Sequence, residues 1–595
     1  MQSAETVLDV IGKRGARGLP VERLYRQMFN PQLYLMAYGK LYSNKGAMTP
    51  GVTGETVDGM SLAKIETIID ALRHERYRWR PVKRIYIPKR NGKQRPLGLP
   101  TWSDKLVAEV VRLLLEACYE PQFSGRSHGF RPGRGCHTAL SEVVEVWKGT
   151  HWFIEGDIPD CFGSFDHDLM AGILAEKIHD GRFLRLMRNM LTAGYLEDWR
   201  WNATLSGCPQ GGIASPVLSN VYLDRLDQYV GQRLLPECNS GRRRRPNRAY
   251  QVLEYAIQRA RRHGDRAEAR RLTRRRRQLP SQDPADPGYR RLRYVRYCDD
   301  WLLGFAGPRR EAGEIKSKIA AFLRDELKLE LSQSKTLITH ATSQAAHFLG
   351  YEIRAQHSDT KITRQRRAVN GAIGLFVPKT VIRQRCALYM SKGKPAQRGA
   401  LLHDDDFTIA AKYQAEWAGL VQYYPLAQDV FRLGRLHWVM ETSLLKTLAG
   451  KHRSTVNSIA RKYRATVETP AGPRKCLQVT VERDRGRKPL AARFGGIPLR
   501  RVRTAVLTDQ RPVMASARRN ELIHRLLAGR CQICEDTVNL EVHHVRKLAD
   551  LSKPGRRDKP AWMHLMAKRR RKTLVTCRRC HEDIHAGRAT RPYPK

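Results

Sequence analysis

Two adjacent aspartates, Asp299 and Asp300, interrupt a run of aromatic and aliphatic residues that extends from Tyr294 to Phe305. The run is typical of two buried strands, and aspartate is a poor strand residue. A buried carboxylate without a partner costs several kcal/mol or becomes protonated. A hairpin turn explains the pair, because aspartate tolerates turn geometry, and a metal site is the alternative. The choice between them depends on a third carboxylate.

The composition predicts a multidomain protein with a nucleic-acid partner. A chain of 595 residues exceeds what one hydrophobic core supports, so we expect roughly three to five domains. Hydrophobic residues make up 41% of the chain, which is enough for sizeable cores and excludes general disorder. Lysine and arginine number 108 against 58 aspartates and glutamates, a formal charge of +50. Self-repulsion at this charge destabilises a compact fold unless a polyanion neutralises it.

Targeting signals and disulfide patterns are not evident. The first twenty residues contain no apolar stretch of signal-peptide length, and no uninterrupted apolar run of about 18 residues occurs. We therefore expect a soluble, cytoplasmic protein with no membrane partner. Most of the 12 cysteines are scattered singly, which does not indicate a disulfide framework. The last four form two CxxC pairs near the C-terminus, which predicts a metal site.

Strand-like and helix-like patterns alternate along the chain in the manner of a multidomain α/β (α+β) protein. A strong hairpin signal surrounds Asn91-Gly92, and a helical pattern follows it. The predicted divisions are a helical segment at 1–75, a mixed unit at 76–358, a helical basic segment at 359–465, a basic stretch at 466–515 and the cysteine-containing segment at 516–595.

A basic insertion at about 236–290 interrupts the mixed unit. It contains RRRR at 242–245 and again at 274–277. Low hydrophobicity and repeated like charge predict an exposed segment. Two interpretations stay open: a segment that becomes ordered on a nucleic acid, and a tolerated surface loop.

A third carboxylate, Asp157, ends the strand-like stretch HWFIEGD. A strand that ends in a carboxylate, beside a hairpin that carries Asp299 and Asp300, gives three carboxylates that can hold a pair of divalent cations. Two cations about 3.5–4 Å apart activate an attacking 3′-hydroxyl and stabilise the leaving pyrophosphate in nucleotidyl transfer. This chemistry explains why aspartates stand in an apolar hairpin.

Histidines accompany the C-terminal cysteine pairs, which have the spacing of a four-thiolate structural zinc site. A bare zinc ribbon is one interpretation, but the histidines argue against it. His543 and His544 lie on an expected strand, and His581 and His585 share one face of a helix because they are four residues apart. The cysteines are Cys531, Cys534, Cys577 and Cys580.

Motifs that follow one another in a fixed order carry a family resemblance. They are IPKRNGKQRPLGLPT, SHGFRPGRGCHTAL, EGDIPDCFGSFDH, GCPQGGIASPVLSNVYLDRLD, RYCDDWLLGF, LSQSKTLITH and FLGYEIR. Each motif alone is weak, but the order is specific. The chain resembles, over nearly its whole length, the reverse transcriptases encoded within bacterial group II introns. The resemblance implies right-hand polymerase fingers and palm at 76–358, an all-helical thumb (maturase domain X) at 359–465, an RNA-binding extension at 1–75 and a DNA-binding region at 466–515.

The resemblance also assigns roles within the polymerase. It implies that Asp157, Asp299 and Asp300 are the catalytic carboxylates and bind Mg²⁺. Phe162 takes the position of the aromatic residue that excludes a nucleotide 2′-hydroxyl, which implies a preference for deoxynucleotides.

Four further residues are implied to bind nucleotide. Gln210 and Gly211 fall where the family contacts the incoming nucleotide and the template. Lys89 and Arg95, on the expected fingers hairpin, are candidates for the triphosphate, and the planar arginine fork suits phosphate oxygens. For these two, contact with template phosphates is an equal alternative.

The C-terminal segment resembles the HNH nuclease module, a zinc-stabilised ββα-metal fold. The resemblance implies that His544 is the general base, and that a catalytic cation is surrounded by His543, His581 and His585. The middle Asn of the motif is not evident, since Lys572 or Thr573 lies near its place. A decayed, DNA-binding zinc finger is therefore the alternative.

The resemblance implies a multifunctional protein of a group II intron: RNA-directed DNA polymerase, maturase in intron RNA splicing and DNA endonuclease, acting in retrohoming by target-primed reverse transcription. The implied partners are group II intron RNA, target DNA and deoxynucleoside triphosphates, and the implied cofactors are Mg²⁺ and structural Zn²⁺. The alternatives are an RNA-folding splicing cofactor with vestigial catalytic sites, and a reverse transcriptase of a retron or defence system. The sequence leaves the intron class, the DNA target, the splicing contacts and the oligomeric state open.

Overall fold

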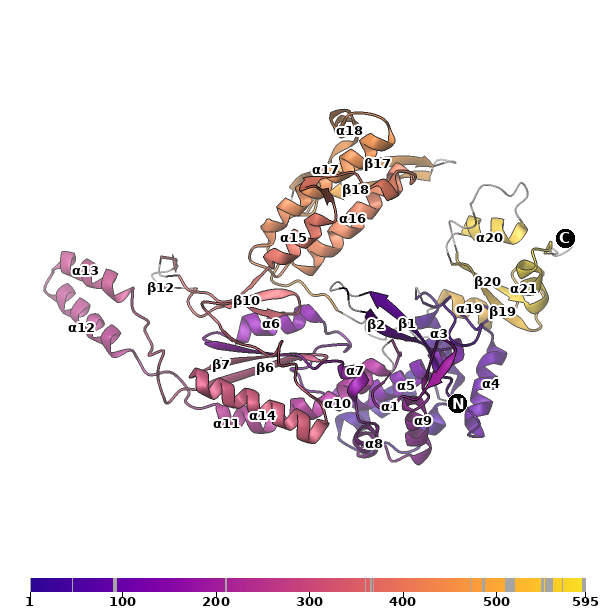
Figure 1. Cartoon of the computed structure of the whole chain (residues 1–595), viewed down its shortest axis with the longest axis horizontal. Helices are drawn as coiled ribbons and strands as arrows, with labels where there is room; N and C mark the ends of the chain where they lie inside the picture. Colours follow the sequence, from indigo (N-terminus) through magenta and orange to yellow (C-terminus); the bar gives the residue numbers. More distant parts are fainter. Residues whose placement is uncertain are drawn as a thin grey trace.

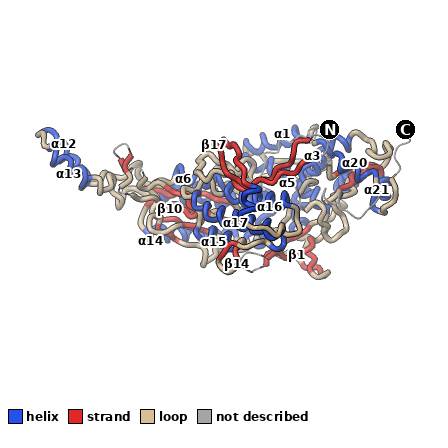
Figure 2. Tube along the Cα trace, turned by 90° about the horizontal axis from the view of Figure 1, so that it is seen from above, coloured by secondary structure: helices blue, strands red, loops and turns tan. Residues whose placement is uncertain are grey.

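The N-terminal helices and the C-terminal module lie toward one end of an elongated molecule, and a projecting pair of helices forms the other end (Figures 1 and 2). No helix among the described residues is both long and apolar enough to cross a membrane. This computed structural model describes residues 2–44, 46–88, 92, 94–208, 211–358, 360–363, 366–367, 369–470, 472–483, 487–508, 520–546, 551, 560–569 and 571–590.

The N-terminal region, residues 2–75, is helical, as its pattern predicts. The helices α1, α3 and α4 of this region begin at side-chain caps: Ser3, Asn30 and Ser61 each accept a hydrogen bond from a first-turn backbone N–H. The next helix is capped by Thr101, whose hydroxyl oxygen accepts a hydrogen bond from the backbone N–H of Asp104. The helices are α1 (Ala4–Ala16), α2 (Leu24–Gln27), α3 (Pro31–Leu41), α4 (Leu62–Arg73) and α5 (Trp102–Tyr119).

A four-stranded antiparallel sheet, the central sheet, lies in the middle of the molecule in the order β6-β7-β3-β8. Neighbouring residues of one strand enter different cores: Phe153 packs with α6, whereas Ile154 packs with α14. Both faces are therefore buried, which explains why these strands read as continuous apolar runs. The elements are β3 (Trp152–Gly156), β6 (Arg291–Tyr297), β7 (Asp300–Ala306), β8 (Ile338–His340), α6 (Cys136–Val146) and α14 (Arg309–Leu327).

A second four-stranded sheet, in the order β2-β1-β4-β5, contains the hairpin expected around Asn91. The paired strands bring Lys83 opposite Leu99 and Pro88 opposite Gln94. Its strands are β1 (Val82–Pro88), β2 (Gln94–Leu99), β4 (Tyr195–Glu197) and β5 (Arg200–Asn202). The helices between and after them are η1 (Glu120–Gln122), α7 (Cys161–Ser164), α8 (His167–Ala175), α9 (Gly181–Leu191), α10 (Ser215–Tyr229), η2 (Val230–Leu234) and α11 (Leu235–Cys238).

The basic insertion forms the projecting pair of helices, α12 (Arg248–Arg262) and α13 (Arg266–Arg276) (Figure 1). Asn247 and Asp265 cap them, and most of their side chains are exposed, as the composition predicts. Ile257 and Ala269 are buried where the two helices contact each other.

The prediction that 359–465 is all-helical is wrong for its first part. Strand β13 (Ile373–Phe376) pairs with β10 (Tyr351–Ala355), so the mixed sheet-containing unit continues past residue 358. Ile373 and Leu375 are buried, and these apolar side chains complete the sheet rather than begin a helix. The remaining strands are β9 (Ala346–Phe348), β11 (Ile362–Thr363), β12 (Arg366–Arg367), β14 (Met390–Ser391) and β15 (Lys394–Pro395).

From Lys379 onward the chain is mainly helical, and α16 packs against a three-stranded antiparallel sheet, β16-β17-β18, that follows it. Tyr413 and Trp417 are buried in the shared core. The helices are α15 (Lys379–Ala387), η3 (Gly399–Leu401), α16 (Asp406–Tyr423), η4 (Val430–Leu433), α17 (Gly434–Lys451) and α18 (Val456–Tyr463). The strands are β16 (Arg464–Thr469), β17 (Gly472–Arg483) and β18 (Arg487–Gly495).

The C-terminal module, residues 520–590, packs against the N-terminal region (Figure 1). Leu522, Ile523 and Leu526 of its first helix belong to the same hydrophobic core as the N-terminal helices. Val542 also pairs with Met60 as an isolated antiparallel bridge. The elements are α19 (Glu521–Leu527), β19 (Leu540–His544), α20 (Ala561–Arg569), β20 (Thr573–Cys577) and α21 (Arg578–His585).

Candidate functional site

Sheet register places the three aspartates at one end of the central sheet. Gly156 is the last residue of β3 and pairs with Trp301, so Asp157 comes next to Asp300 at the start of β7. Tyr297 pairs with Asp300, which leaves Cys298 and Asp299 as a two-residue turn, with Cys298 at a positive φ of 57°. The hairpin turn is therefore confirmed, and it presents the carboxylates where the metal site is predicted.

The aspartates act on one another electrostatically. Burial raises the pKa of Asp300 to about 7, and the negative charges of Asp299 and Asp157 contribute to the same shift. Burial and Asp157 also raise the pKa of Asp299, against the opposing positive charges of Arg95 and Lys335. Lys335 Nζ lies 2.8 Å from Asp157 Oδ2.

This donor set fits a hard divalent cation. Carboxylate oxygens are the ligands that Mg²⁺ accepts, and a cation would relieve the repulsion that raises the two pKa values. The three aspartates do not form a tight cluster. In the part of the chain that the structure describes, two groups of potential metal ligands have all their ligand atoms within 4.8 Å of one another, and both include residues of the C-terminal module rather than these aspartates. Lys335 instead supplies positive charge at Asp157.

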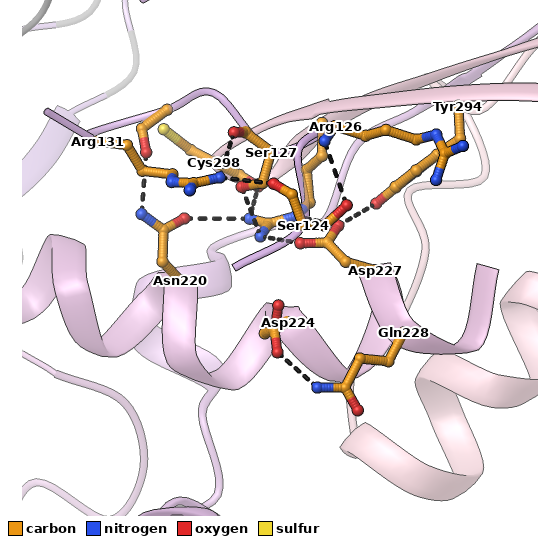
Figure 3. A network of polar contacts seen from close by, with 12 residues as sticks. Ser124, Arg126, Ser127, Arg131, Asn220, Asp224, Asp227, Gln228, Tyr294 and Cys298 are labelled. Atoms are coloured by element: carbon orange, nitrogen blue, oxygen red, sulfur yellow. Dashed lines mark hydrogen bonds and ion pairs between the residues drawn. The ribbon is translucent and has the colours of Figure 1, made fainter. Parts of the chain in front are cut away.

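A buried arginine braces the aspartate turn, through a polar network in which Figure 3 shows Ser127, Asp227 and Cys298 close together. Arg296, on β6, has no exposed surface and forms a two-point contact with Asp227, at 2.8 and 2.6 Å. Its guanidinium also donates to Ser127 Oγ at 2.9 Å and to the carbonyl oxygen of Cys298, also at 2.9 Å. Because Cys298 precedes Asp299, this network fixes the backbone that carries the carboxylates. An arginine between Val295 and Tyr297, in the apolar second half of β6, is the signal in the sequence that could have revealed it.

Phe162 lies on α7, the short helix that begins four residues after Asp157. Its ring is 6.5 Å from that of Phe130 and 6.2 Å from that of Phe165. Its backbone oxygen accepts a hydrogen bond from Cys208 N–H at 2.7 Å. Cys208 therefore lies against the short helix that carries Phe162.

Gly211 lies against the β1–β2 hairpin. Its φ is +95°, and a Cβ there would stand 2.6 Å from Leu97 Cδ1, so the close approach requires glycine. A cavity of about 260 Å³ opens between this hairpin and the Phe162 turn, and its wall includes Arg84, Gly98 and Gly163. Arg95, on β2, is exposed and is the hairpin residue whose charge lowers the pKa of Asp299. The two other residues expected to bind nucleotide, Lys89 and Gln210, lie outside the described residues.

The four C-terminal cysteines come together. One Sγ atom from each lies within 4.8 Å of all the others, and Cys534 Sγ is 3.6 Å from that of Cys577 and 3.5 Å from that of Cys580. Four thiolates at this spacing fit a tetrahedral zinc ion. They join the loop before β19 to the start of α21.

The histidines form a second cluster in the module, on β19 and α21. His581 Nε2 and His585 Nε2 are 3.2 Å apart, and the ring centre of His543 is 5.4 Å from that of His581. His581 Nδ1 contacts Glu541 Oε2 at 2.8 Å, a carboxylate–histidine pair that is typical of metal sites. Glu541 was not predicted, although it shares a strand face with His543 because it is two residues away.

The cluster includes Asp58, a residue of the N-terminal region that sequence reasoning missed. Its carboxylate lies 2.7 Å from His585 Nε2 and 3.3 Å from His581 Nε2. Burial raises the pKa of Asp58, but hydrogen bonds from His543 and His581 outweigh it and lower this pKa. Burial lowers the pKa of His581, but Asp58 and Glu541 outweigh it, so that pKa is raised. Nothing in the local sequence pairs Asp58 with these histidines.

His544 lies on the opposite face of β19 from His543 and is buried. Burial lowers its pKa to about 3, and the positive neighbours His543 and Arg525 add to the shift while Asp58 opposes it. Its Nε2 is 3.0 Å from the hydroxyl oxygen of Tyr38. Thr573, one of the residues near the expected Asn position, pairs with His544 across the sheet. Its hydroxyl accepts a hydrogen bond from Arg525 at 2.8 Å, and among the described residues no hydrogen bond joins it to the His544 ring.

Known protein families match the three parts of the chain in which these features lie. Residues 87–353 match reverse transcriptase (RNA-dependent DNA polymerase), residues 373–477 match type II intron maturase, and residues 531–581 match AI2M/AI1M-like HNH endonuclease. The fold and sites therefore define a reverse transcriptase that carries maturase and HNH endonuclease regions.

Individual relatives narrow this class. The chain is 36% identical to the group II intron-encoded protein LtrA of Lactococcus lactis subsp. cremoris, across 98% of this chain and 99% of the relative. It is 33% identical to an uncharacterized 91 kDa protein in the cob intron of Schizosaccharomyces pombe, across 98% of this chain and 72% of that protein. Protein YkfC of Escherichia coli K12 is 32% identical over 60% of this chain. The chain belongs to the family of group II intron-encoded proteins, and it is a multifunctional member with polymerase, maturase and endonuclease regions.

Proposed function

We propose that this protein binds its own group II intron RNA, assists its splicing, and then inserts the intron into DNA by target-primed reverse transcription. In this scheme the intron RNA reverse-splices into one DNA strand and the C-terminal module cuts the other. The freed 3′-hydroxyl then primes DNA synthesis on the RNA. We place these reactions in a bacterial cytoplasm, because LtrA, which matches 98% of this chain over 99% of its own length, is a bacterial protein.

The polymerase has the right-hand arrangement in this proposal. The central sheet is the palm, the β1–β2 hairpin belongs to the fingers, and α15–α18 form the thumb and maturase domain. What supports this division is that Asp157 and the Asp299–Asp300 turn meet at one end of the central sheet, with Arg95 on the hairpin close enough to influence Asp299.

Asp157, Asp299 and Asp300 hold the catalytic Mg²⁺. When bound, Mg²⁺ activates the primer hydroxyl and neutralises charge on the triphosphate. Arg95 contacts the triphosphate from the fingers, and Lys89 and Gln210 remain predicted nucleotide ligands with Gly211. Phe162 restricts the space beside the sugar and so favours deoxynucleotides. Arg296 holds the aspartate turn in place.

The C-terminal module is the nuclease. His544 accepts the proton of the attacking water, while His543, His581 and His585 hold a divalent cation, which stabilises the leaving oxygen when bound. The four cysteines hold structural Zn²⁺, which fixes the end of β20 relative to α21.

Intron RNA binds along the helical and basic surfaces. Trp438 of α17 and Phe431 just before it are 58% and 66% exposed, although most aromatic residues of this region are core. Exposed rings next to Arg432 and Arg435 suit unpaired bases, which stack on aromatic side chains. The arginine-rich α12–α13 pair adds a phosphate-binding surface.

The meeting of three carboxylates at the end of the central sheet carries the proposal, and primer extension tests it. Purified protein, a primed RNA template, deoxynucleotides and Mg²⁺ should give DNA product. The Asp299→Ala/Asp300→Ala variant should lose at least about 10³-fold in rate, as expected when a main electrostatic stabiliser is removed. Asp325→Asn, on the exposed face of α14, is the matched control. Product from the double variant at the parent's rate would refute the site, and RNA binding without synthesis by the parent would favour a splicing cofactor.

A further inference from the structure

The segment around Asp58 is fixed to the C-terminal module by backbone hydrogen bonds. Gly59 N–H donates to the carbonyl oxygen of Val542 at 3.1 Å, and Val542 N–H donates to that of Met60 at 2.9 Å. Val57 and Met60 are fully buried on either side. The segment therefore adds a short strand-like edge to β19, and this pairing sets the direction of the Asp58 side chain.

The Asp58 carboxylate enters the histidine cluster of the module. It lies 2.7 Å from His585 Nε2, 3.3 Å from His581 Nε2 and 3.5 Å from His543 Nδ1. One Oδ1 lone pair also accepts the backbone N–H of His544 at 2.6 Å, from a residue 486 positions later in the chain. Ligand atoms from all four side chains lie within 4.8 Å of one another.

The histidine nitrogens are arranged for a cation rather than for hydrogen bonds alone. His581 Nδ1 is occupied by Glu541, which directs its Nε2 toward the cluster. That Nε2 and His585 Nε2 face each other at 3.2 Å. His543 is 4% exposed, its Nδ1 lies 3.5 Å from Asp58 Oδ1, and its Nε2 has no hydrogen-bond partner among the described residues. A shared metal ion would satisfy these nitrogens together.

Three histidines and one carboxylate form a complete set of four protein ligands. Catalytic metal sites usually keep three protein ligands and leave the fourth position for water or substrate, whereas closed sets of four are structural. A carboxylate and a phosphodiester both offer anionic oxygens to a cation. Asp58 thus occupies the position that the scissile phosphate of DNA would need.

The expected general base is also covered in this arrangement. His544 is 5% exposed, and its Nε2 is engaged by the Tyr38 hydroxyl from α3. The rings of Tyr38 and Tyr42 each lie 6.3 Å from its imidazole. A water molecule could take the place of the Tyr38 hydroxyl at His544 Nε2 only if α3 moved away from β19. The N-terminal region therefore blocks access to both the cation site and the general base.

We infer that Asp58 is an intramolecular ligand of the nuclease cation, which takes the place of the scissile phosphate and keeps the nuclease closed while the N-terminal region is docked. The inference rests on the proposed nuclease function. Opening then requires the 57–60 segment to leave β19, and the ligand that displaces Asp58 is the DNA phosphate itself.

Metal binding and hydrogen exchange test the ligand without relying on cleavage. Ni²⁺ is the probe, because it binds imidazole-rich sites better than all-carboxylate sites. The full-length protein is first loaded with zinc at its cysteines. Asp58→Asn should weaken Ni²⁺ binding about tenfold or more by calorimetry. Ni²⁺ should slow amide exchange at 57–60 and 540–544 in the parent and not in the variant. Asp70→Asn, an exposed carboxylate of α4 in the same region, should behave as the parent. Unchanged Ni²⁺ affinity and exchange in Asp58→Asn would overturn the inference.

Cleavage of plain duplex DNA by the protein without RNA, at saturating metal, tests the closed state. Asp58→Asn should cleave on the order of tenfold faster than the parent, because the substitution shifts the equilibrium between the closed and the open nuclease by about that factor. Tyr38→Phe should also accelerate cleavage while leaving Ni²⁺ affinity unchanged, because it frees His544 and preserves the core. Loss of cleavage in Asp58→Asn would overturn the inference, since Asp58 would then belong to the working site. No cleavage by any variant, or by the intron ribonucleoprotein, would count against the proposed nuclease, while calorimetry and exchange would still decide the ligand.

Discussion

The central-sheet site and the C-terminal histidine site are built in opposite ways. Asp157, Asp299 and Asp300 come from neighbouring strands of one sheet, and Arg296 braces them from within the same region. The histidine site takes its carboxylate, Asp58, from the other end of the chain. The first site is therefore a property of one folded region, and the second depends on how two regions are packed together.

The two sites should therefore differ in how packing between regions regulates them. A site that is complete within one region is ready whenever that region is folded. A site completed by a distant segment responds to any partner that shifts the packing of the two regions. A polymerase with a local site beside a nuclease with a divided one suits a protein that should cut DNA only when its substrate is in place.

The largest effect should come from the cysteine cluster. Cys577→Ser removes one of four thiolates, and structural zinc contributes an apparent 10–16 kcal/mol, roughly, to folding in small zinc modules. We expect the module after α19 to become protease-sensitive, while primer extension stays at the parent rate because the central sheet does not depend on it. Limited proteolysis with mass spectrometry and primer extension measure the two parts. Cys238→Ser, which changes a half-buried single cysteine, is the control. Loss of primer extension together with the gain in protease sensitivity would show that the regions are not independent.

His544→Ala should slow DNA cleavage without slowing primer extension and without unfolding the module. Loss of a general base lowers the rate by about 10²–10⁴-fold. We expect that loss in second-strand DNA cleavage by the reconstituted ribonucleoprotein, with unchanged primer extension. His564→Ala, on the exposed side of α20, should cleave normally. Cleavage by His544→Ala at the parent rate would remove this histidine from the mechanism.

Arg296→Met should damage only the central-sheet site. It leaves Asp227 buried without its partner, which costs about 3–5 kcal/mol in comparable buried pairs. Faster amide exchange in β6 and β7 and slower primer extension should follow, with normal Ni²⁺ binding in the module. Arg310→Met, whose ion pair with Glu314 is exposed, should have no effect.

A double variant sharpens the same test. Arg296→Met combined with Asp227→Leu replaces the buried pair by apolar side chains, which is often neutral for stability. Slow exchange should return, whereas primer extension should stay impaired because the hydrogen bond to the Cys298 carbonyl is still missing. Full recovery of extension would mean that Arg296 only stabilises the region and does not position the turn.

Glu541→Gln should give the smallest effect. It weakens the partner that orients His581, and such substitutions typically lower metal affinity 10–100-fold. We expect a loss near the lower figure in Ni²⁺ affinity by calorimetry, without a change in polymerase rate. Glu582→Gln, an exposed neighbour on α21, is the control. An unchanged affinity in Glu541→Gln would mean that Asp58 alone orients His581.

The sequence was informative where local rules decide structure. The apolar runs before Asp157 and around Asp299 predicted strands, and the structure has β3, β6 and β7 there. The HxxxH spacing placed His581 and His585 on one helix face, and they lie together on α21. The prediction failed for residues 373–376, because the apolar residues of β13 have no helical or strand periodicity long enough to show that they complete a distant sheet.

The sequence by itself determined the chemical groups of both sites: carboxylates at a hairpin turn, thiolates in CxxC pairs, histidines on a strand and a helix. Spacing of two to four residues fixes which side chains share a face, so these groups follow from the order of amino acids. Only the tertiary structure decided that Arg296 would reach Asp227, and that Asp58 would enter a histidine cluster 485 or more positions away. Contacts of that separation depend on the packing of whole helices and sheets, to which no local pattern refers.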